Sequence, residues 1–551
     1  MPFSDAELAR ERAAQDWNLA DVFELVADTC PEREALLHGT DGAVRTWREL
    51  DRRANALARH LARSHAPGAK IALYAHNRPE FVEALFGAFK ARLVPVNVNY
   101  RYREEELVYL FDNSDAEVVI YEATYAGVVA KVRDRAPGVR EWIELEDGAP
   151  GNAFATPYEP LVAAGAERLD LPRAGGDLLF LYTGGTTGMP KGVMWEQSAL
   201  WRTLGGGGNV VLGEKPSTSY AEQRDRIAQE ARAQRILPGS PLMHGTGLFT
   251  TLNALGGGGA CITLTARSLD AEELWDVVER RRATALSIVG DAFAKPMLRA
   301  LEAHPGRWKL DHCRLLVSSG VMWSPEVKRG LLKHLPGAIL FDSFGSSEAT
   351  GFGAEVTTKD SETKVGRFKI GPNCKVFTPE GQEVVPGSGE PGFIARSGPI
   401  PLGYYKDEKK SAETFRTIGG VRWSIPGDWC TVEADGTITL LGRGSVCINT
   451  GGEKVYPEEI EEVLKEHPGV NDALVVGVPD EKWGEAVTAM VERRPGAGVT
   501  ADELKARVRE KLAGYKTPKN VIFVETMGRA PNGKADYKGM KARAKQELGI
   551  A

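Results

Sequence analysis

The sequence predicts an α/β fold of two domains, in which a mainly parallel sheet is covered by helices. Helical and strand patterns alternate through the first 170 residues, and an apolar strand runs into a glycine-rich loop at 183–188. After about residue 390 the pattern changes to short strands and Gly/Pro turns, and a compact α/β pattern begins afresh at Val446. These observations favour a large domain followed by a small one.

The alternation begins with a helix whose apolar residues fall on one stripe: Trp47, Leu50, Ala54, Leu57 and Leu61. Thr46 and Glu49 have the spacing of a capping box at its start. The elements expected next are a strand at 70–76, a helix at 79–91, a strand at 94–99, a helix at 104–111 and a strand at 116–122. This order predicts strands that run parallel.

Helical and strand patterns also alternate in the shorter C-terminal part of the chain. We expect a helix from Pro457, strands at 472–478 and 486–492, and a second helix behind a Thr500/Glu503 capping box. We place the domain boundary near Gly444, so that the domains are 1–443 and 444–551. The polar residues 215–235 are interpreted as a surface insertion with a solvated helix.

The composition is that of a soluble globular protein. Of 551 residues, 42% are apolar and 26% charged, which excludes a disordered or fibrous chain. Lys and Arg number 69 against 75 Asp and Glu, and this net charge of −6 does not favour nucleic acid as a partner. The N-terminus carries charges where a signal peptide needs an apolar stretch, and no run approaches the ~18 apolar residues of a membrane span.

The six cysteines are scattered, without a C-x-x-C pair or zinc-ligand spacing. This pattern is typical of a reducing compartment and gives no sign of a structural metal. We therefore expect a cytoplasmic protein without a transmembrane segment. The sequence leaves open whether it forms a homodimer.

The glycine-rich loop can bind phosphate. Its backbone N–H groups and hydroxyls can donate to an anion, and Lys191 adds positive charge; the loop residues are Thr183, Gly184, Gly185, Thr186, Thr187 and Gly188. It is not a Walker A loop, because Met-Pro separates Gly188 from Lys191. An ordinary glycine-rich turn after a strand explains the loop about equally well when it is taken alone.

The loop resembles the phosphate-binding signature of the adenylate-forming superfamily, which includes acyl-CoA synthetases, firefly luciferase and peptide-synthetase adenylation domains. In that superfamily a Ser usually stands at the position of Gly184. Further segments match in the family's order: PLMHGTG (241–247), SSGV (318–321), FDSFGSSE (341–348), WSIPGDW (423–429), GRGS (442–445), INTGGEKVYP (448–457) and PNGK (531–534). The resemblance covers the chain from about residue 25 to 545.

The resemblance implies a large N-terminal adenylate-forming domain, with αβαβα sheets plus a distorted β-barrel, and a small mobile α/β C-terminal domain. It also implies residue roles. The loop residues and Lys191 would bind the phosphates of ATP, and the rest of the nucleotide would contact Gly320, Asp342, Phe344, Gly345, Asp428 and Arg443. Glu348 would bind magnesium, and the catalytic set would be Lys534, Glu348 and Ser347.

Further roles follow from the same resemblance. His244 would line the acyl pocket, Gly451 and Gly452 would line the pantetheine tunnel of coenzyme A, and Ser445 would be the hinge. The family usually has Asp or Lys at the hinge, so Ser445 departs from its pattern.

The function that this resemblance implies is ATP-dependent acyl-CoA synthesis. A medium- or long-chain or bulky carboxylic acid would react with ATP to give acyl-AMP, and the acyl group would pass to CoA. A steroid side-chain or aromatic acid CoA ligase is an alternative within this class. A luciferase-like oxygenase and a non-catalytic nucleotide- or acyl-binding paralogue are alternatives from other classes.

Overall fold

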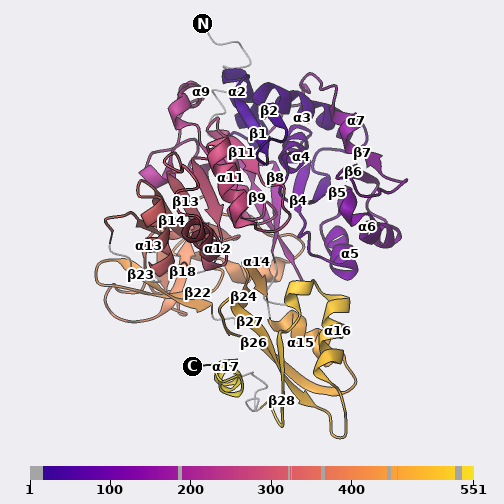
Figure 1. The fold of residues 1–551 in the computed structure, drawn as a ribbon, viewed down its shortest axis with the longest axis vertical. Helices are drawn as coiled ribbons and strands as arrows, with labels where there is room; N and C mark the ends of the chain where they lie inside the picture. The colour runs from indigo at the N-terminus through magenta and orange to yellow at the C-terminus, as the bar shows by residue number, and fades with distance from the viewer. Residues whose placement is uncertain are drawn as a thin grey trace.

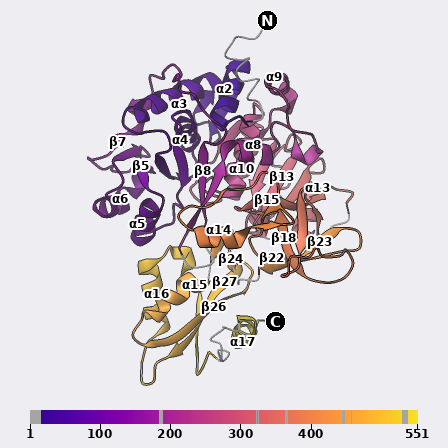
Figure 2. The same ribbon diagram turned by 180° about the vertical axis from the view of Figure 1, so that it is seen from behind.

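The computed structural model describes residues 16–183, 189–320, 323, 325–361, 367–443, 448–455, 457–527 and 537–550. The described strands form three sheets, of fifteen, eight and five strands. The two larger sheets belong to a large N-terminal domain, and the third belongs to a small C-terminal domain that lies at the bottom of Figure 1. Figure 2 shows the same arrangement from behind.

The eight-stranded sheet contains the alternating elements that the sequence predicts. Its strand order is β19-β9-β8-β4-β3-β5-β6-β7, and the pairs from β8 to β7 are parallel. The bounds are β3 (Lys70–Tyr74), β4 (Val94–Asn97), β5 (Ala116–Glu122), β6 (Glu141–Leu145), β7 (Thr156–Pro157), β8 (Leu178–Thr183), β9 (Lys191–Glu196) and β19 (Gly403–Tyr404). The predicted parallel strands are therefore confirmed here.

The fifteen-stranded sheet has a parallel part and an antiparallel part. The parallel part is formed by β1 (Glu34–His38), β10 (Arg235–Pro238), β11 (Ala260–Thr263), β12 (Ala285–Ile288), β13 (Leu315–Ser319) and β14 (Ile339–Ser346), with β2 (Val44–Thr46) antiparallel at its edge. The antiparallel part, where we expect the distorted barrel, contains β15 (Ala349–Thr357), β16 (Arg367–Ile370), β17 (Cys374–Phe377), β18 (Gly392–Arg396), β20 (Phe415–Ile418), β21 (Val421–Ser424), β22 (Asp428–Val432) and β23 (Thr437–Arg443).

Helices lie on both sides of the two large sheets. One apolar core joins the sheets through α2 (Leu19–Thr29), α3 (Trp47–Leu61), α4 (Pro79–Lys90) and α10 (Gly245–Gly256). The outer face of the fifteen-stranded sheet packs against α11 (Ala271–Arg281), α12 (Gly290–Ala303) and α13 (Pro325–His334). The outer face of the eight-stranded sheet packs against α5 (Glu104–Asn113) and α6 (Ala126–Val132). These layers are the expected αβαβα arrangement.

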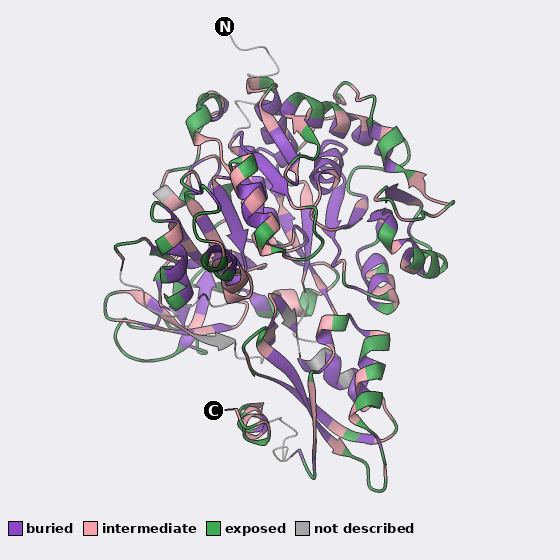
Figure 3. Cartoon of the chain, in the orientation of Figure 1, coloured by how far each residue is buried: buried purple, intermediate pink, exposed green. Residues whose placement is uncertain are grey.

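Helix α3 forms where its sequence signals predict. The Thr46 side chain accepts from the N–H of Glu49, and the Glu49 carboxylate accepts from the N–H of Thr46, so the capping box is present. The predicted apolar stripe of α3 is buried. Figure 3 shows that strands inside the molecule are buried, whereas helices at the surface expose their outer faces.

Residues 215–235 are not only a solvated insertion. Helix α9 (Tyr220–Ala228) buries Tyr220, Gln223 and Ile227. The Tyr220 ring meets Trp17 edge-on at 5.8 Å, and Gln223 Nε2 donates to the carbonyl of Gly256 at 3.0 Å. The expectation of a solvated helix holds for one face of α9 only, because its other face covers residues distant in sequence. The remaining helices of the large domain are α7 (Tyr158–Val162), α8 (Gln197–Thr203) and α14 (Glu408–Thr414).

The small domain is a five-stranded sheet with helices on both faces. Its strands are β24 (Ile448–Thr450), β25 (Glu453–Val455), β26 (Val470–Asp480), β27 (Gly484–Arg493) and β28 (Asn520–Val524). Helices α15 (Pro457–Lys465) and α16 (Ala501–Lys511) pack on one face, and α17 (Tyr537–Glu547) packs on the other. The predicted helix at Pro457 and the Thr500/Glu503 capping box are confirmed. Within the described ranges, no helix is long and apolar enough to cross a lipid bilayer.

Candidate active site

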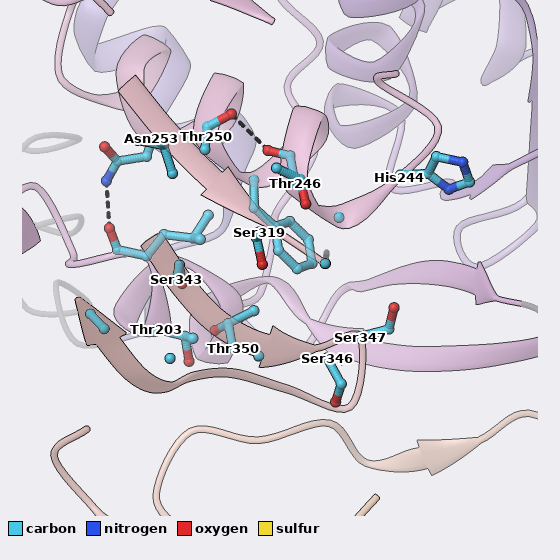
Figure 4. Close-up of a pocket in the computed structure, with 18 of the residues that line it drawn as sticks. Thr203, His244, Thr246, Thr250, Asn253, Ser319, Ser343, Ser346, Ser347 and Thr350 are labelled. Carbon is cyan, nitrogen blue, oxygen red and sulfur yellow. Dashed lines mark hydrogen bonds between the residues drawn. The ribbon is translucent and has the colours of Figure 1, made fainter. Parts of the chain in front are cut away.

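A cavity of about 880 Å3 lies where the carboxyl ends of the parallel strands meet the small domain. Its walls include Thr183 at the end of β8, Ser319 at the end of β13 and Thr246 on α10. Figure 4 shows side chains from α10, β13 and β14 around this space. The small domain contributes Gly452, Glu453 and Tyr515. Ligands of α/β sheets bind at this edge, so the cavity is the candidate active site.

Asn97 joins three segments of the cavity wall. Its Oδ1 accepts from the N–H of Tyr182 at 2.5 Å, and its Nδ2 donates to the carbonyls of Tyr182 at 3.0 Å and Met243 at 2.6 Å. The end of β4 is thereby held to β8 and to the segment that precedes α10. The side chain of Asn97 is buried, so water does not compete for these bonds.

Residues 184–188 of the predicted phosphate loop lie outside the described residues. Both flanks are described: Thr183 lines the cavity and pairs with Lys191 across the β8–β9 hairpin. The Lys191 ammonium forms an ion pair with Asp407. Burial opposes ionisation of Asp407, but Lys191 and Lys410 together outweigh it and hold the pKa of this carboxyl below its ordinary value.

Strand β14 brings alternate residues to the cavity. Phe341, Ser343 and Gly345 line it, whereas Asp342 and Phe344 do not. Lys328 Nζ lies 3.1 Å from the Asp342 carboxylate, and burial raises the pKa of Asp342 to about 6 although Lys328 opposes the rise. Phe344 packs with Phe352 and Phe368 in an apolar cluster. Of the residues expected at the adenine, Gly345 and Gly320 (φ +94°) are in the cavity wall.

The turn after β14 holds Ser347 and Glu348, which both line the cavity. The Tyr404 hydroxyl donates to Glu348 Oε1 at 2.7 Å, and Ser424 Oγ donates to the Glu348 carbonyl at 2.8 Å. Trp195 Nε1 donates to the Ser347 carbonyl at 3.0 Å. Three separate elements therefore hold this turn and its carboxylate in place.

Strand pairing brings two further predicted residues together. Asp428 in β22 lies opposite Arg443 in β23, and Asp428 is buried. Ser445 and Lys534 lie outside the described residues, so the structure gives neither the hinge nor the expected catalytic lysine.

The β24–β25 hairpin places the small domain against the cavity. Gly451 and Gly452 form its turn with positive φ angles, +58° and +85°, and a Cβ on Gly452 would lie 3.4 Å from the Val289 side chain of the large domain. The next residue, Glu453, accepts from His244 Nε2 at 3.0 Å and pairs with Arg101 at 3.2 Å.

Glu453 is buried, and its charge is stabilised by cationic side chains of both domains. Burial opposes ionisation, but attraction to His244, Arg101 and Lys516 outweighs it, so the pKa of Glu453 lies below its ordinary value. A second buried pair also joins the domains, between Lys516 Nζ and Glu106 Oε1 at 2.8 Å.

Sequence reasoning missed Asn97, Arg101, Tyr404 and Glu453. Their partners are distant in sequence; Glu453 and His244 are 209 positions apart. Only Glu453 had a local signal, because it directly follows the predicted Gly451-Gly452 pair. Among the described residues no three His, Cys, Asp or Glu side chains form a metal-binding group.

Comparison with known proteins agrees with this two-domain site. The model of the family "AMP-binding enzyme" matches residues 23–405, and the model "AMP-binding enzyme C-terminal domain" matches residues 459–534. The chain belongs to the AMP-binding enzyme family. Its fold is the adenylate-forming fold, with a large N-terminal and a small C-terminal domain.

Curated AMP-binding enzymes match over nearly the full length. A 3-oxocholest-4-en-26-oate–CoA ligase from Rhodococcus rhodochrous is 44% identical over 535 residues, which cover 95% of each chain. A medium/long-chain-fatty-acid–CoA/3-oxocholest-4-en-26-oate–CoA ligase from Mycobacterium marinum is 43% identical over 95% of this chain and 96% of its own. Among solved structures, the amide bond synthetase of Marinactinospora thermotolerans has the same fold, with a TM-score of 0.77 and 23% identity over 96% of this chain and 99% of its own.

Proposed function

We propose that this AMP-binding enzyme is an ATP-dependent acyl-CoA synthetase for a medium- or long-chain or bulky carboxylic acid. The observation that carries the proposal is the full-length similarity, at 43–44% identity, to enzymes named as CoA ligases of such acids. The cavity supports it, because walls from two domains enclose about 880 Å3, enough for a large acyl group. A steroid side-chain acid is included among the candidate substrates.

The first step joins the acid to AMP. The carboxylate attacks the α-phosphorus of ATP and pyrophosphate leaves, so two anions must be brought together and stabilised. We assign the phosphates to the loop 183–188 and Lys191, and the ribose to Asp428 and Arg443. The adenine is assigned to Gly320 and Gly345, because Asp342 and Phe344 do not line the cavity. Lys534 would neutralise the charge that develops between the carboxylate and the α-phosphate.

Glu348 is the residue that would hold magnesium. Magnesium commonly binds proteins through one or two carboxylates and completes its shell with water and substrate phosphates. Glu348 lines the cavity and is held in place by the Tyr404 hydroxyl, so its carboxylate fits this requirement. When bound, the ion would screen phosphate charge. Ser347 adjoins this carboxylate and completes the proposed catalytic set.

The second step transfers the acyl group to the thiol of CoA. We propose that the small domain, residues 444–551, rotates about Ser445 relative to residues 1–443, so that Lys534 leaves and Gly451-Gly452 faces the pantetheine arm. The position of Gly452 at the cavity supports this role, and His244 beside it would line the acyl pocket near the thiol.

The function is tested by mass spectrometry of CoA esters formed from a mixed acid pool with ATP, magnesium and CoA. We expect esters of medium- or long-chain or steroid acids, with stoichiometric pyrophosphate. Esters of acetate alone would contradict the proposed substrate class. Nucleotide binding without pyrophosphate release would indicate a non-catalytic paralogue, and light emission with luciferin would indicate the oxygenase. We further propose a cytoplasmic location, and light scattering would test for a homodimer.

A further inference from the structure

A buried arginine lines the cavity without a role in the activation of the acid. Arg396 is the last residue of β18, and only 7% of it is exposed to solvent. Its Nη1 donates to the carbonyl of Gly351 in β15 at 2.9 Å. Both residues belong to the cavity wall.

The positive charge of Arg396 is not balanced by a carboxylate in the described part of the chain. The titratable group beside it is the Cys374 thiol, and burial lowers the pKa of the guanidinium. Its Nε is buried and has no hydrogen-bond acceptor among the residues that the structure describes. Burial of an unpaired charge is costly, so proteins normally pair such a group with an anion or saturate its N–H groups with acceptors. The hydrogen bonds of Arg396 to the Gly351 carbonyl and to Cys374 leave Nε, one of its five N–H groups, unsatisfied within the described residues.

The wall beside Arg396 holds a second unsatisfied polar group. Thr350 precedes Gly351 and lines the cavity, and its buried Oγ1 has no hydrogen-bond partner in the described part of the chain. The neighbouring segment of the cavity lining is formed by Lys369, Ile370, Gly371 and Pro372. Unsatisfied buried donors are rare in proteins and require an explanation. Here two of them occur on adjoining parts of one wall of the candidate active site.

We propose that Arg396, assisted by Thr350, binds an oxygen on the acyl group other than the carboxylate being activated. This inference rests on the proposed function. The acids favoured would carry a hydroxyl, keto or second carboxylate group along the chain or ring system, since each offers a lone pair to the guanidinium. Arg396 is thus a specificity-determining residue, and the enzyme discriminates against acids that leave its N–H groups unsatisfied.

The wild-type enzyme provides the first test. The kcat/KM for CoA ester formation is measured with octanoic, dodecanoic and hexadecanoic acids and with the ω-hydroxy, ω-oxo and ω-carboxy derivative of each. We expect at least one derivative to exceed its plain acid by roughly ten- to a hundredfold, as for a hydrogen bond from a charged donor. The preferred derivative identifies the oxygen group. Plain acids that match or exceed their derivatives at every length would overturn the inference.

Variants test the assignment to Arg396. In Arg396→Met the ratio of kcat/KM between the favoured derivative and its plain acid should fall toward one, and in Thr350→Val it should fall part of the way. Arg422→Met is the matched control, because Arg422 also donates to backbone carbonyls, those of Pro401 and Leu402, but does not line the cavity. It should keep the wild-type ratio.

An unchanged ratio in Arg396→Met, or an equal loss for plain and derivatised acids, would overturn the assignment. If Arg396→Met does not fold, Thr350→Val decides, since Thr350 Oγ1 makes no hydrogen bond within the described residues that the substitution would remove. Failure of the proposed function gives a different result, with no CoA ester from any acid, plain acids included.

Discussion

At the scale of single residues, three buried carboxylates near the cavity are stabilised in different ways. Glu348 accepts from a tyrosine hydroxyl, Glu453 is paired with His244 and Arg101, and Asp342 shares Lys328 with Glu355. The consequences for ionisation differ, because the pKa of Glu453 is lowered and that of Asp342 is raised. Their effects on stability therefore have opposite dependence on pH.

Asp342 should make the protein less stable as pH rises from 4 to 7. Its pKa is about 6 in the fold, above the ordinary 3.8, so the fold favours the protonated form and this stabilisation is lost as pH passes through 6. The loss is about 3 kcal/mol at most. In Asp342→Asn, Tm measured across this range should lack the corresponding decrease. Asp41→Asn, at an exposed site, is the control, and a parallel pH profile in wild type and Asp342→Asn would contradict the prediction.

Lys534→Ala should abolish adenylate formation and largely spare the reaction of supplied acyl-AMP with CoA. Removal of one such charge-stabilising donor typically costs about 2.7–4 kcal/mol in the barrier, or 10² to 10³ in rate. Pyrophosphate release and thioester formation are measured separately. An equal loss in both half-reactions would show that the lysine is misassigned.

At the scale of elements, the β24–β25 hairpin is sensitive to side-chain size. Gly451 has φ +58°, and a Cβ there would lie 2.6 Å from the Trp483 ring, so any larger residue must displace the hairpin or the ring. Gly451→Leu should therefore suppress CoA ester formation and spare ATP–pyrophosphate exchange. Suppression of both activities would contradict the tunnel assignment.

The interface of α2 and α4 depends on a buried charge network. Lys90 Nζ contacts Glu24 at 2.8 Å and Asp51 at 2.7 Å, and Glu24 is 1% exposed. Lys90→Met should lower the free energy of unfolding by about 3–5 kcal/mol, because carboxylates remain buried with less compensation. Arg280→Met removes the exposed pair with Asp41 and should cost within about 1 kcal/mol. Denaturation of both variants gives the comparison, and similar losses would contradict this account.

At the scale of the whole molecule, the two domains are joined by buried polar contacts. Lys516 pairs with Glu106 at 2.8 Å, and Asn99 Nδ2 donates to the Tyr515 hydroxyl at 3.2 Å. Ala513 and Tyr515 also pack against an apolar cluster of the large domain. In the same arrangement Gly452 and Glu453 face the cavity, so these contacts stabilise it.

Lys516→Met should therefore shift the enzyme away from this arrangement. Glu106 would be left buried without its cation, which disfavours the contact. We expect CoA ester formation to fall while pyrophosphate release with the acid and ATP is retained. Lys519→Met is the control, because the partner of Lys519, Asp480, lies within the small domain. Equal losses in both half-reactions would contradict the prediction.

Local signals in the sequence predicted much of the fold. The Thr46/Glu49 and Thr500/Glu503 boxes act over three residues, and the stripe of α3 depends on helical spacing alone, so both could be read without tertiary information. The buried face of α9 could not, because Tyr220 and Gln223 find Trp17 and Gly256 only in the folded chain.

The candidate site, too, could be predicted only as far as local sequence motifs reach. The ordered motifs located Thr183, Gly320, Ser347, Glu348 and Gly452, all of which line the cavity. The sequence did not predict Arg396 and Glu453 as site residues. An arginine at the end of a strand and a glutamate after two glycines are both common in protein sequences. Only their burial and their neighbours from distant segments indicate that they belong to the site.

The bonds of Asn97 have a consequence for hydrogen–deuterium exchange. The amide proton of Tyr182 is held by the Asn97 side chain, and it can exchange only when the end of β8 opens away from Asn97 in β4. Strong protection of this amide, alongside faster exchange in the β24–β25 turn, would mark a cavity wall that stays intact while the small domain moves against it.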